Sequence, residues 1–539
     1  MIKNISTSPY TDQKMGTAGI RKKVPTVQQP NYIENFMQSL FDAIGGVEGK
    51  TFVLGSDGRY YNDVALQKII KMSAANGMKK LIIGQNGMMS TPASSCILLK
   101  NHADGGLMLT ASHNPGGING DFGIKYATQT GGQCSSLTSD KIYARTKEIT
   151  SYKTLDAEDV NLSLLGTQFL EGMEIEVIDP IEDYLKMMES IFDFDAIKKL
   201  FKTDFSFVFD AMNAVTGPYA IKIFEEVLGA EKGSVHQSVP LPDFGGLHPD
   251  PNLVYAKHLV DLMYSDNAPD FAAANDGDGD RNMILGKKFF VSPSDSLAIL
   301  TDNYYQIPAY KNGISGVAKS AATSTAVERV ASNLGINYFE VPTGWKNFCN
   351  LMDSNLITFC GEESFGTSSS HIREKDGIWA VLFWLNIIAN TGKSVEQITR
   401  DFWAKYGRTY YLRFDFEGID TAVADTLMND LENKLPSLAG TVVEGYRITK
   451  AHPFVYTDPV DKQSTKNGLL VYFEGGSRIC FRLSGTGTNG ATLRVYIETY
   501  EKTDFDKDPK STLETLLKVA MILAEIKQRT SKDKPDIIT

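Results

Sequence analysis

A serine and a histidine stand side by side where an apolar segment breaks into a turn. Residues 110–117 read TASHNPGG and follow the apolar run Leu107–Leu109. A loop at the end of a strand presents side chains that a packed element would bury, and glycine lets a charged ligand approach the backbone closely. Ser112 is therefore predicted to be displayed, either as a nucleophile or as the carrier of a transferred group.

Three aspartates alternate with glycines directly after another apolar run. Residues 275–281 read NDGDGDR and follow Phe271–Ala274. The aspartates are Asp276, Asp278 and Asp280. Hard oxygen ligands on a loop loosened by glycine suit Mg²⁺ or Ca²⁺, and so dense an anionic cluster repels itself without a cation. An EF-hand is excluded, because its loop needs glycine and glutamate where Arg281 and Lys287 stand.

Polar residues also crowd the start of a nearly apolar helix that we predict over residues 378–389. The preceding segments read GEESFG at 361–366 and HIREKDG at 371–377. Four side chains here could bind a ligand or take part in a reaction. Glu362 and Ser364 could bind hydroxyl groups, and Arg373 and Lys375 could bind phosphate or transfer a proton. Taken alone, such a segment is also typical of a charged helix start.

Two further loops combine positive charge with glycine and hydroxyl groups. Residues 482–494 read RLSGTGTNGATLR, whose backbone amides and two arginines suit a phosphate-binding nest. It is not a Walker A loop, because no GK[ST] follows. Residues 16–24 read GTAGIRKKV and place Thr17 and Arg21 beside other cations. Two misleading motifs are set aside: DFG at 121–123 lacks an HRD loop, and Ser112 lacks the GxSxG elbow of a hydrolase.

Strand, helix and strand alternate through most of the chain. We predict buried strands at 51–55 and 81–84 with a helix between them, and the same unit follows the strands at 205–210 and 313–318. This alternation indicates α/β domains with largely parallel sheets and right-handed crossovers. The last part differs, with strands at 468–473, 479–483 and 492–498 before a closing helix, and indicates an α+β domain.

Length and composition limit the class of protein. A chain of 539 residues suggests about four domains, and a net charge of −11 disfavours a nucleic-acid partner. Five scattered cysteines without a CxxC pair indicate neither a zinc site nor a disulfide framework, and fit a reducing cytosol. We find no secretory signal and no run of about 18 apolar residues, so we expect a soluble cytoplasmic protein without membrane insertion.

In this order, TASHNPGG, DGDGDR, GEESFG and RLSGTGT resemble the four active-site loops of the phosphoglucomutases in the α-D-phosphohexomutase superfamily. The resemblance spans nearly the whole chain. It extends to GTAGIRKKV, GDFGIK at 120–125, PSDSLA at 293–298, VPTGWKNF at 341–348 and HIREKDGIWAVL. It implies four domains around a central cleft, the first three sharing a mixed α/β sheet plan. The expected extents of the four domains are 1–190 with the phosphoserine loop, 191–300 with the metal loop, 301–410 with the sugar loop and 411–539 with the phosphate loop.

The resemblance also implies roles for individual residues. It implies that Ser112 is phosphorylated and that one Mg²⁺ per chain is held by Ser112, Asp276, Asp278 and Asp280. The catalytic residues it implies are Ser112, His113, Lys125, Lys375 and Arg21, with His113 and Lys375 as candidates for proton transfer. The substrate-binding residues are Thr17, Arg281, Thr343, Gly344, Glu362, Ser364, Arg482, Ser484, Gly485, Thr486, Gly487, Thr488 and Arg494.

The implied activity is the interconversion of glucose 1-phosphate and glucose 6-phosphate, an isomerase reaction of carbohydrate metabolism. It runs through a phosphoserine enzyme and a glucose 1,6-bisphosphate intermediate that reorients between two phosphoryl transfers. Two alternatives share the motifs: a glucose 1,6-bisphosphate synthase, and a non-catalytic, parafusin-like structural or secretion-linked protein. We expect a sugar phosphate as the partner, and a monomer or weak dimer.

Overall fold

The computed structural model describes residues 1–16, 19–484 and 490–539, which form two compact units. The first unit consists of Met1–Val291, Asn303–Gly313 and Ser364–Val395, and the second of Ser292–Asp302, Ile314–Glu363 and Glu396–Thr539. The predicted binding residues Thr17, Gly485, Thr486, Gly487 and Thr488 lie outside the described residues. Within the described part of the chain, no helix combines the length and apolarity needed to cross a membrane.

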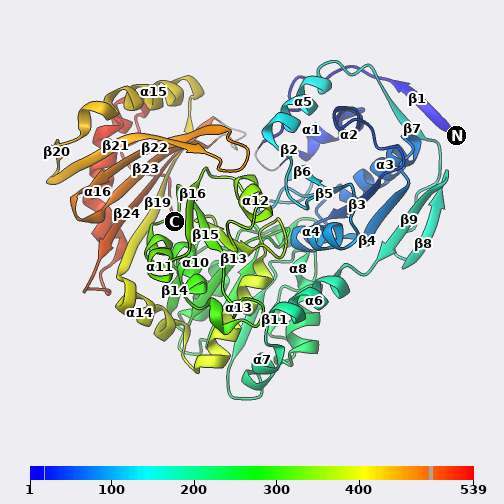
Figure 1. Cartoon of the computed structure of the whole chain (residues 1–539). Helices are drawn as coiled ribbons and strands as arrows, with labels where there is room; N and C mark the ends of the chain where they lie inside the picture. Colours follow the sequence, from blue (N-terminus) through cyan, green and yellow to red (C-terminus); the bar gives the residue numbers. More distant parts are fainter. Residues whose placement is uncertain (17–18, 485–489) are drawn as a thin grey trace. The chain divides into compact units, whose positions relative to one another are not determined.

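A seven-stranded mixed sheet in the first unit carries the Ser112 loop (Figure 1). Its strands, in spatial order, are β2 (Ile20–Lys23), β6 (Asp121–Thr128), β5 (Gly105–Leu109), β3 (Thr51–Ser56), β4 (Lys80–Met88), β9 (Met173–Ile178) and β8 (Gly166–Leu170). The four strands β5, β3, β4 and β9 are parallel, whereas β2, β6 and β8 pair antiparallel. The crossover helices α3 (Asn62–Ala75) and α4 (Thr91–Lys100) join the parallel strands, as the strand–helix–strand pattern predicts.

Helices cover both faces of this sheet, which explains why its central strands are apolar throughout. Phe52 and Leu54 of β3 pack into one core with α3 and with α2 (Tyr32–Ala43). On the other face, α4 lies so close to β5 that a side chain at Gly106 would meet Leu98. Parallel strands buried on both faces read as continuous hydrophobic runs.

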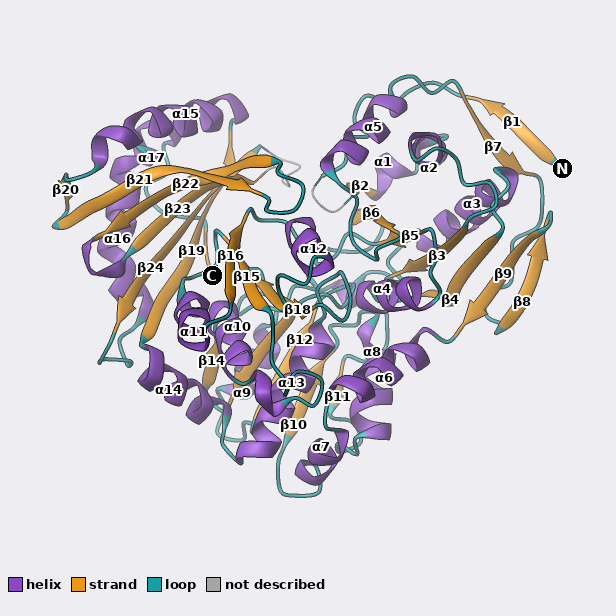
Figure 2. Ribbon diagram, in the orientation of Figure 1, coloured by secondary structure: helices purple, strands orange, loops and turns teal. Residues whose placement is uncertain are grey.

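A five-stranded sheet in the same unit carries the aspartate loop (Figure 2). Its spatial order is β11 (Val235–His236), β10 (Phe207–Asp210), β12 (Phe271–Asn275), β13 (Asn282–Gly286) and β14 (Phe289–Val291). Every residue of β12 is buried, and β13 returns antiparallel to it, so residues 276–281 form a tight reverse connection. Helix α13 (Gly377–Thr391) packs against β12 and β13 and starts at Asp376, whose side chain accepts a hydrogen bond from the amide of Trp379.

The second unit contains a smaller parallel sheet that ends at the predicted sugar-binding residues. Its parallel strands are β16 (Asn337–Val341), β15 (Gly316–Ser320) and β17 (Phe359–Glu362), and its helices are α10 (Pro293–Asp302), α11 (Ala326–Leu334) and α12 (Lys346–Asp353). Thr343 lies two residues after the end of β16, and Glu362 is the last residue of β17, so both are found at strand ends.

An antiparallel sheet of seven strands completes the second unit (Figure 2). Its spatial order is β20 (Val442–Val443), β21 (Tyr446–Thr457), β22 (Ser464–Phe473), β23 (Arg478–Ser484), β24 (Ala491–Glu501), β19 (Arg408–Ile419) and β25 (Ile537–Ile538). Helices α15 (Thr421–Leu438) and α16 (Pro509–Leu523) cover one face through a core of Leu, Ile, Val and Phe side chains. On the other face, Cys480 and Tyr496 pack with Phe348 and Met352 of α12. The predicted α+β character of this part is confirmed.

The remaining elements connect or flank these sheets. They are β1 (Ile2–Ser6), α1 (Val24–Val27), α5 (Ser136–Thr146), β7 (Ser151–Leu155), α6 (Pro180–Ile191), α7 (Phe194–Leu200), α8 (Thr216–Ala220), a π-helix (Ile221–Val227), α9 (Lys257–Met263), β18 (Gly366–Ser369), α14 (Val395–Tyr406), α17 (Ile526–Thr530) and short 3₁₀ turns at Phe244–Gly246, Tyr304–Gln306 and Glu474–Gly476. All five cysteines are buried.

A histidine–aspartate pair between α9 and β10 should make stability depend on pH. The hydrogen bond that the partly exposed His258 donates to buried Asp210 raises the pKa of this histidine above its usual value. A pKa raised by folding stabilises the protein fully below the unfolded pKa of about 6.5, and this contribution is lost as the pH rises through the folded pKa. We therefore expect His258→Gln to lower the Tm more near pH 6 than near pH 8.5, and the exposed His102→Gln to show no such difference. Equal losses of Tm at both pH values would contradict the pairing.

Candidate active site

Ser112 follows β5 and is held in a strained backbone conformation. Its φ is +54°, in the left-handed region that serine rarely adopts, and the residue is 4% exposed. Its amide donates a hydrogen bond to Thr110 Oγ1 at 2.7 Å. Its hydroxyl donates to Asp276 Oδ2 at 3.0 Å, and it lies 3.3 Å from His113 Nδ1. The displayed serine is thus directed at the aspartate loop of the neighbouring sheet.

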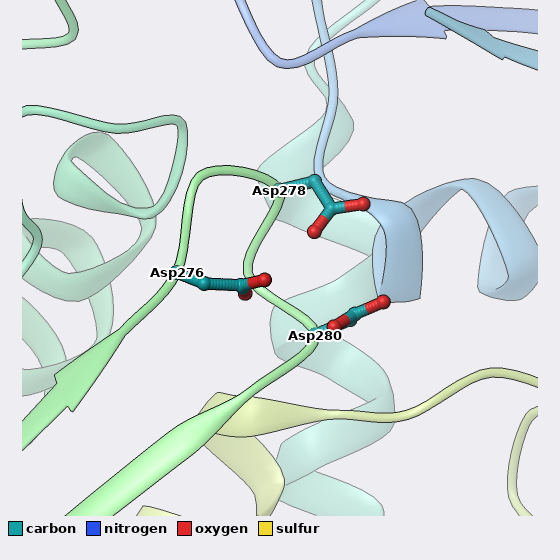
Figure 3. Close-up of side chains that lie close together, drawn as sticks. All are labelled: Asp276, Asp278 and Asp280. Atoms are coloured by element: carbon teal, nitrogen blue, oxygen red, sulfur yellow. The ribbon is translucent and has the colours of Figure 1, made fainter. Parts of the chain in front are cut away.

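The three aspartates converge as the sequence predicted (Figure 3). One carboxylate oxygen of each lies within 4.8 Å of the others, and all three residues are buried. Two glycines make this loop possible: Gly279 has a φ of +80°, and a Cβ on Gly277 would lie 2.4 Å from the Ser112 carbonyl oxygen. Only glycine lets the two loops approach this closely.

The lysines Lys125 of β6 and Lys375 lie beside the aspartates. Lys125 Nζ donates to Asp278 Oδ2 at 2.7 Å and to Asp280 Oδ2 at 3.3 Å, and Lys375 Nζ is 3.1 Å from Asp280 Oδ1. Burial opposes ionisation of Asp278, but the ammonium of Lys125 holds its pKa below the usual range. Asp276 differs, because burial and the charges of Asp280 and Asp278 raise its pKa well above the usual value.

The donor set fits a hard divalent cation. Besides the three carboxylates, the Ser112 hydroxyl points at the same place, and Asp278 Oδ1 is buried with no hydrogen-bond partner among the described residues. A buried carboxylate oxygen without a partner is costly, and a bound cation would satisfy it. A cation would also remove the like-charge repulsion that raises the pKa of Asp276.

Two arginines add positive charge beside Ser112. The Arg281 amide donates to Asp276 Oδ1 at 2.9 Å, and its guanidinium pairs with Asp250 at 3.0 Å. Arg21 donates to Asn114 Oδ1 at 2.9 Å, and burial together with the neighbouring arginines Arg59 and Arg281 lowers its pKa to about 10. A cation whose pKa is lowered by burial and by neighbouring cations favours an anionic ligand.

His113 is half-buried and is uncharged near neutral pH. Burial, and then the nearby charges of Arg281 and Arg21, hold its pKa well below the usual value. A neutral imidazole can accept a proton, and its Nδ1 is within reach of the Ser112 hydroxyl. The structure therefore brings Ser112 and His113 together with Lys125, Lys375 and Arg21 around the aspartate cluster, all within the first unit.

Four partners of these residues were not predicted from the sequence. They are Thr91, which donates to Asp278 Oδ2 at 2.7 Å; Asp250, which pairs with Arg281; Glu374, whose pKa burial raises to about 7 beside Lys125; and Arg59, which donates to the Ser112 carbonyl oxygen at 2.8 Å. Arg59 lies in the loop after β3, and loops at the carboxyl ends of neighbouring parallel strands meet at one edge of a sheet. This rule could have identified Arg59 from the sequence as a residue near Ser112.

We expect the folding of this site to depend strongly on Arg59. Its guanidinium pairs with buried Asp57 at 2.8 Å and also holds the carbonyl oxygens of Asp121 and Ser112, each at 2.8 Å. Arg59→Met leaves the carboxylate of Asp57 buried without its counter-ion, so we expect a loss of about 3–5 kcal/mol, measured by chemical denaturation. Arg145→Met is the control, since its ion pair with Asp42 is one-third exposed and we expect a loss below about 1 kcal/mol. Similar losses in both variants would contradict this role.

The second unit contains three of the four predicted sugar-binding residues, Thr343, Gly344 and Glu362. The Gly344 amide donates to Glu362 Oε1 at 2.8 Å, and the Thr343 amide donates to Asn467 Oδ1 at 3.2 Å. Asn467 Oδ1 also accepts from Arg482 Nε at 3.0 Å. One asparagine thus joins the loop after β16 to the strand that carries Arg482. Ser364 belongs to the first unit.

The predicted phosphate-binding residues of the last sheet lie on adjacent strands. Arg482 of β23 is directly opposite Arg494 of β24, and Ser484 is opposite Thr492. Like charges directly opposite each other in a sheet are destabilising, so a pair of this kind favours an anion between them.

Comparison with known families accounts for nearly the whole chain. Models of the α/β/α domains I, II and III of phosphoglucomutase/phosphomannomutase match residues 12–153, 182–288 and 293–406, respectively. A model of the C-terminal domain of phosphoglucomutase-1 matches residues 408–536.

Individual relatives agree with these matches over their full length. The chain is 54% identical to a phosphoglucomutase of Rhizobium radiobacter, with 100% of both chains covered, and 48% identical to one of Aspergillus fumigatus, also with 100% of both covered. The crystal structure of the Paramecium exocytosis-sensitive phosphoprotein pp63/parafusin, a phosphoglucomutase, superimposes with a TM-score of 0.92 at 45% identity and covers 100% of this chain and 99% of its own. The chain therefore belongs to the phosphoglucomutase family of the α-D-phosphohexomutase superfamily.

Proposed function

We propose that the protein interconverts glucose 1-phosphate and glucose 6-phosphate through a phosphorylated Ser112 and a glucose 1,6-bisphosphate intermediate. The observation that carries this proposal is the Ser112 hydroxyl, which is buried 3.0 Å from Asp276 among the three converging carboxylates and the surrounding lysines and arginines. Full-length similarity to named phosphoglucomutases supports it. A serine hydrolase would need an oxyanion hole at Ser112, whereas the Ser112 hydroxyl is directed at a cluster of carboxylates.

In the forward step, the bond between phosphorus and Ser112 Oγ breaks and a bond between phosphorus and a sugar hydroxyl oxygen forms. The proton of that hydroxyl must leave, and we propose His113 or Lys375 as its acceptor or relay, because both lie at the cluster. In the return step, the bond between the other phosphorus of the bisphosphate and its sugar oxygen breaks, a bond between that phosphorus and Ser112 Oγ forms, and the sugar oxygen takes up a proton. Arg21, Arg281 and Lys125 orient the transferring group and offset its negative charge.

We propose that Asp276, Asp278, Asp280 and the Ser112 phosphate hold one Mg²⁺. The cation, when bound, supplies positive charge that neutralises the phosphoryl oxygens during transfer. Carboxylate and phosphate oxygens are the ligands that Mg²⁺ prefers, and the partnerless Asp278 Oδ1 supports this assignment.

We further propose that the sugar hydroxyls are bound by Thr343, Gly344, Glu362 and Ser364. Arg482, Ser484, Gly485, Thr486, Gly487, Thr488 and Arg494 are proposed to bind the phosphate group that is not transferred, and Thr17 is proposed as a further substrate-binding residue. The proposed functional domains remain 1–190, 191–300, 301–410 and 411–539. The five scattered cysteines, which include no CxxC pair, fit a reducing compartment, and we propose a cytoplasmic enzyme that is a monomer or weak dimer.

A coupled assay with glucose 1-phosphate and a glucose 6-phosphate dehydrogenase tests the activity. We expect NADPH production that requires Mg²⁺ and is accelerated by added glucose 1,6-bisphosphate. Release of the bisphosphate in place of glucose 6-phosphate would assign the protein as a synthase instead. The absence of any turnover by the phosphorylated protein would overturn the proposal and favour a structural, parafusin-like role.

A further inference from the structure

The C-terminal sheet carries a third arginine beside the two predicted phosphate-binding arginines. The register of the strands places Asp415 of β19 opposite Arg494 of β24, and Arg494 opposite Arg482 of β23. Residues opposite each other in neighbouring strands project from the same face of a sheet, as do residues two apart along a strand. Arg413, two residues before Asp415, therefore shares the face of Arg482 and Arg494.

Asp415 lies between two of these arginines. Its Oδ1 is 3.1 Å from Arg413 Nε, and its Oδ2 is 3.6 Å from Arg494 Nε. Within the described residues, no other carboxylate lies within ion-pair distance of either guanidinium. The Asp415 side chain is 3% exposed, whereas Arg413 is 19% and Arg494 29% exposed. The carboxylate thus lies beneath the guanidinium groups, which remain open to a ligand.

The charges of all three arginines influence the ionisation of the same buried hydroxyl, that of Tyr496. Arg482 donates to Tyr496 Oη at 3.2 Å, and Arg413 is directly opposite Tyr496 in the register of β19 and β24. Burial and the charge of Glu363 raise the pKa of Tyr496 to about 12, while Arg482, Arg494 and Arg413 each oppose this rise. The three guanidinium groups therefore gather at one place on the sheet.

The charges at this place do not balance. Three guanidinium groups gather with two carboxylates, because Asp415 lies within ion-pair distance of Arg413 and Arg494 and the charge of Glu363 also acts on Arg413 and Arg482, so one positive charge is left over. An uncompensated cluster of arginines is costly by itself and matches the charge of a phosphate monoester, which arginine binds with two parallel hydrogen bonds. Asp415 offsets part of the repulsion and limits the directions in which Arg413 and Arg494 can point.

We propose that Asp415 is a positioning residue that holds Arg413 and Arg494 side by side, and that Arg413 is a third arginine for the non-transferred phosphate of the sugar. Strand β19 then forms a wall of the phosphate site together with β23 and β24. This inference rests on the proposed function for the identity of the ligand. The site itself is defined by strand register and ion pairs within the second unit.

Binding and turnover measurements on three variants test the proposal. Binding of glucose 6-phosphate is measured by calorimetry in a Ser112→Ala background, which needs no turnover, and KM and kcat for glucose 1-phosphate are measured with Ser112 intact. We expect Asp415→Asn and Arg413→Met to weaken glucose 6-phosphate binding and to raise KM by about 10-fold, with kcat within about 3-fold, since this phosphate is bound equally before and during transfer. Arg413→Lys should recover part of the affinity, because it restores the charge but not the two-pronged geometry.

The matched control is Asp430→Asn. Asp430 of α15 pairs with Arg529 at 2.7 Å in the same unit, and we expect its loss to leave binding, KM and kcat unchanged.

Unchanged glucose 6-phosphate affinity in both Asp415→Asn and Arg413→Met would overturn the proposal. A fall in kcat and Tm without a change in affinity would assign a structural role to the pair instead, and would also overturn it. If Asp415→Asn does not fold, Arg413→Met and Arg413→Lys decide the question. Tight sugar-phosphate binding without turnover in the wild type would refute the proposed function but not this site.

Discussion

Replacing Ser112 by alanine is expected to lower kcat for glucose 1-phosphate conversion by at least about 10⁴-fold. The variant has no oxygen that can carry the phosphoryl group between the two steps, and a neighbouring hydroxyl cannot substitute, because the Ser112 hydroxyl is the one that points at Asp276 at 3.0 Å. The coupled glucose 6-phosphate assay measures the loss. Equal turnover by wild type and variant would refute the phosphoserine assignment.

Ser112→Gly separates catalysis from folding. Glycine removes the hydroxyl as alanine does, but it adopts the φ of +54° without the strain that an L side chain bears there. We therefore expect the glycine variant to be as inactive as Ser112→Ala and more stable than it by up to about 1 kcal/mol. Ser139→Ala, on the exposed side of α5, serves as the control and should keep full activity. A glycine variant that is clearly less stable than the alanine variant would show that the left-handed backbone carries no strain.

Replacing Asp276 by asparagine is expected to abolish the response of the protein to Mg²⁺. The side chain is buried, accepts the Ser112 hydroxyl and the Arg281 amide, and has a pKa raised by burial and by its two acidic neighbours. Without a carboxylate at this position, the cation loses one of its charged ligands, and we expect kcat to fall by about 10³-fold or more. The rise in Tm that saturating MgCl₂ produces in the wild type should also disappear.

In the metal-free protein, we expect the same substitution to leave the stability unchanged or to raise it. In the presence of a chelator, Asp276→Asn should be at least as stable as the wild type, because the substitution removes one of three mutually repelling buried carboxylates. Asp266→Asn is the control, since Asp266 is fully exposed and its loss should leave the Mg²⁺ response intact. A normal Mg²⁺-induced rise in Tm in Asp276→Asn would show that the cation binds elsewhere.

Several parts of this site follow from local sequence. The apolar run before NDGDGDR predicts a buried strand, and β12 ends at Asn275, so the three aspartates emerge together from one strand end. The segment HIREKDG was predicted to precede an apolar helix, and α13 begins at Gly377 with Asp376 as its cap. Hydrophobic periodicity and helix capping act over a few residues, which is why they can be recognised without the fold.

Other parts could not be predicted because they depend on contacts between distant residues. Nothing in TASHNPGG indicates that Ser112, in addition to Gly117, adopts a left-handed backbone. Thr91 bonds to an aspartate 187 residues away, and Arg59 supports a loop 53 residues away. Threonine at a helix start and arginine in a turn are common, so neither residue type marks a site by itself.

The sequence by itself determined which chemical groups are available, in which order they occur, and that each loop ends a strand of an α/β or α+β domain. The tertiary structure alone decided which atoms meet: Ser112 with Asp276 across 164 residues, Lys125 with Asp278 across 153, and Asp415 with Arg494 through the register of β19 and β24. The physical reason is the range of the forces involved. Periodicity and turn chemistry act between near neighbours in the chain, whereas hydrogen bonds and ion pairs depend on separations of a few ångströms that only strand register and packing set.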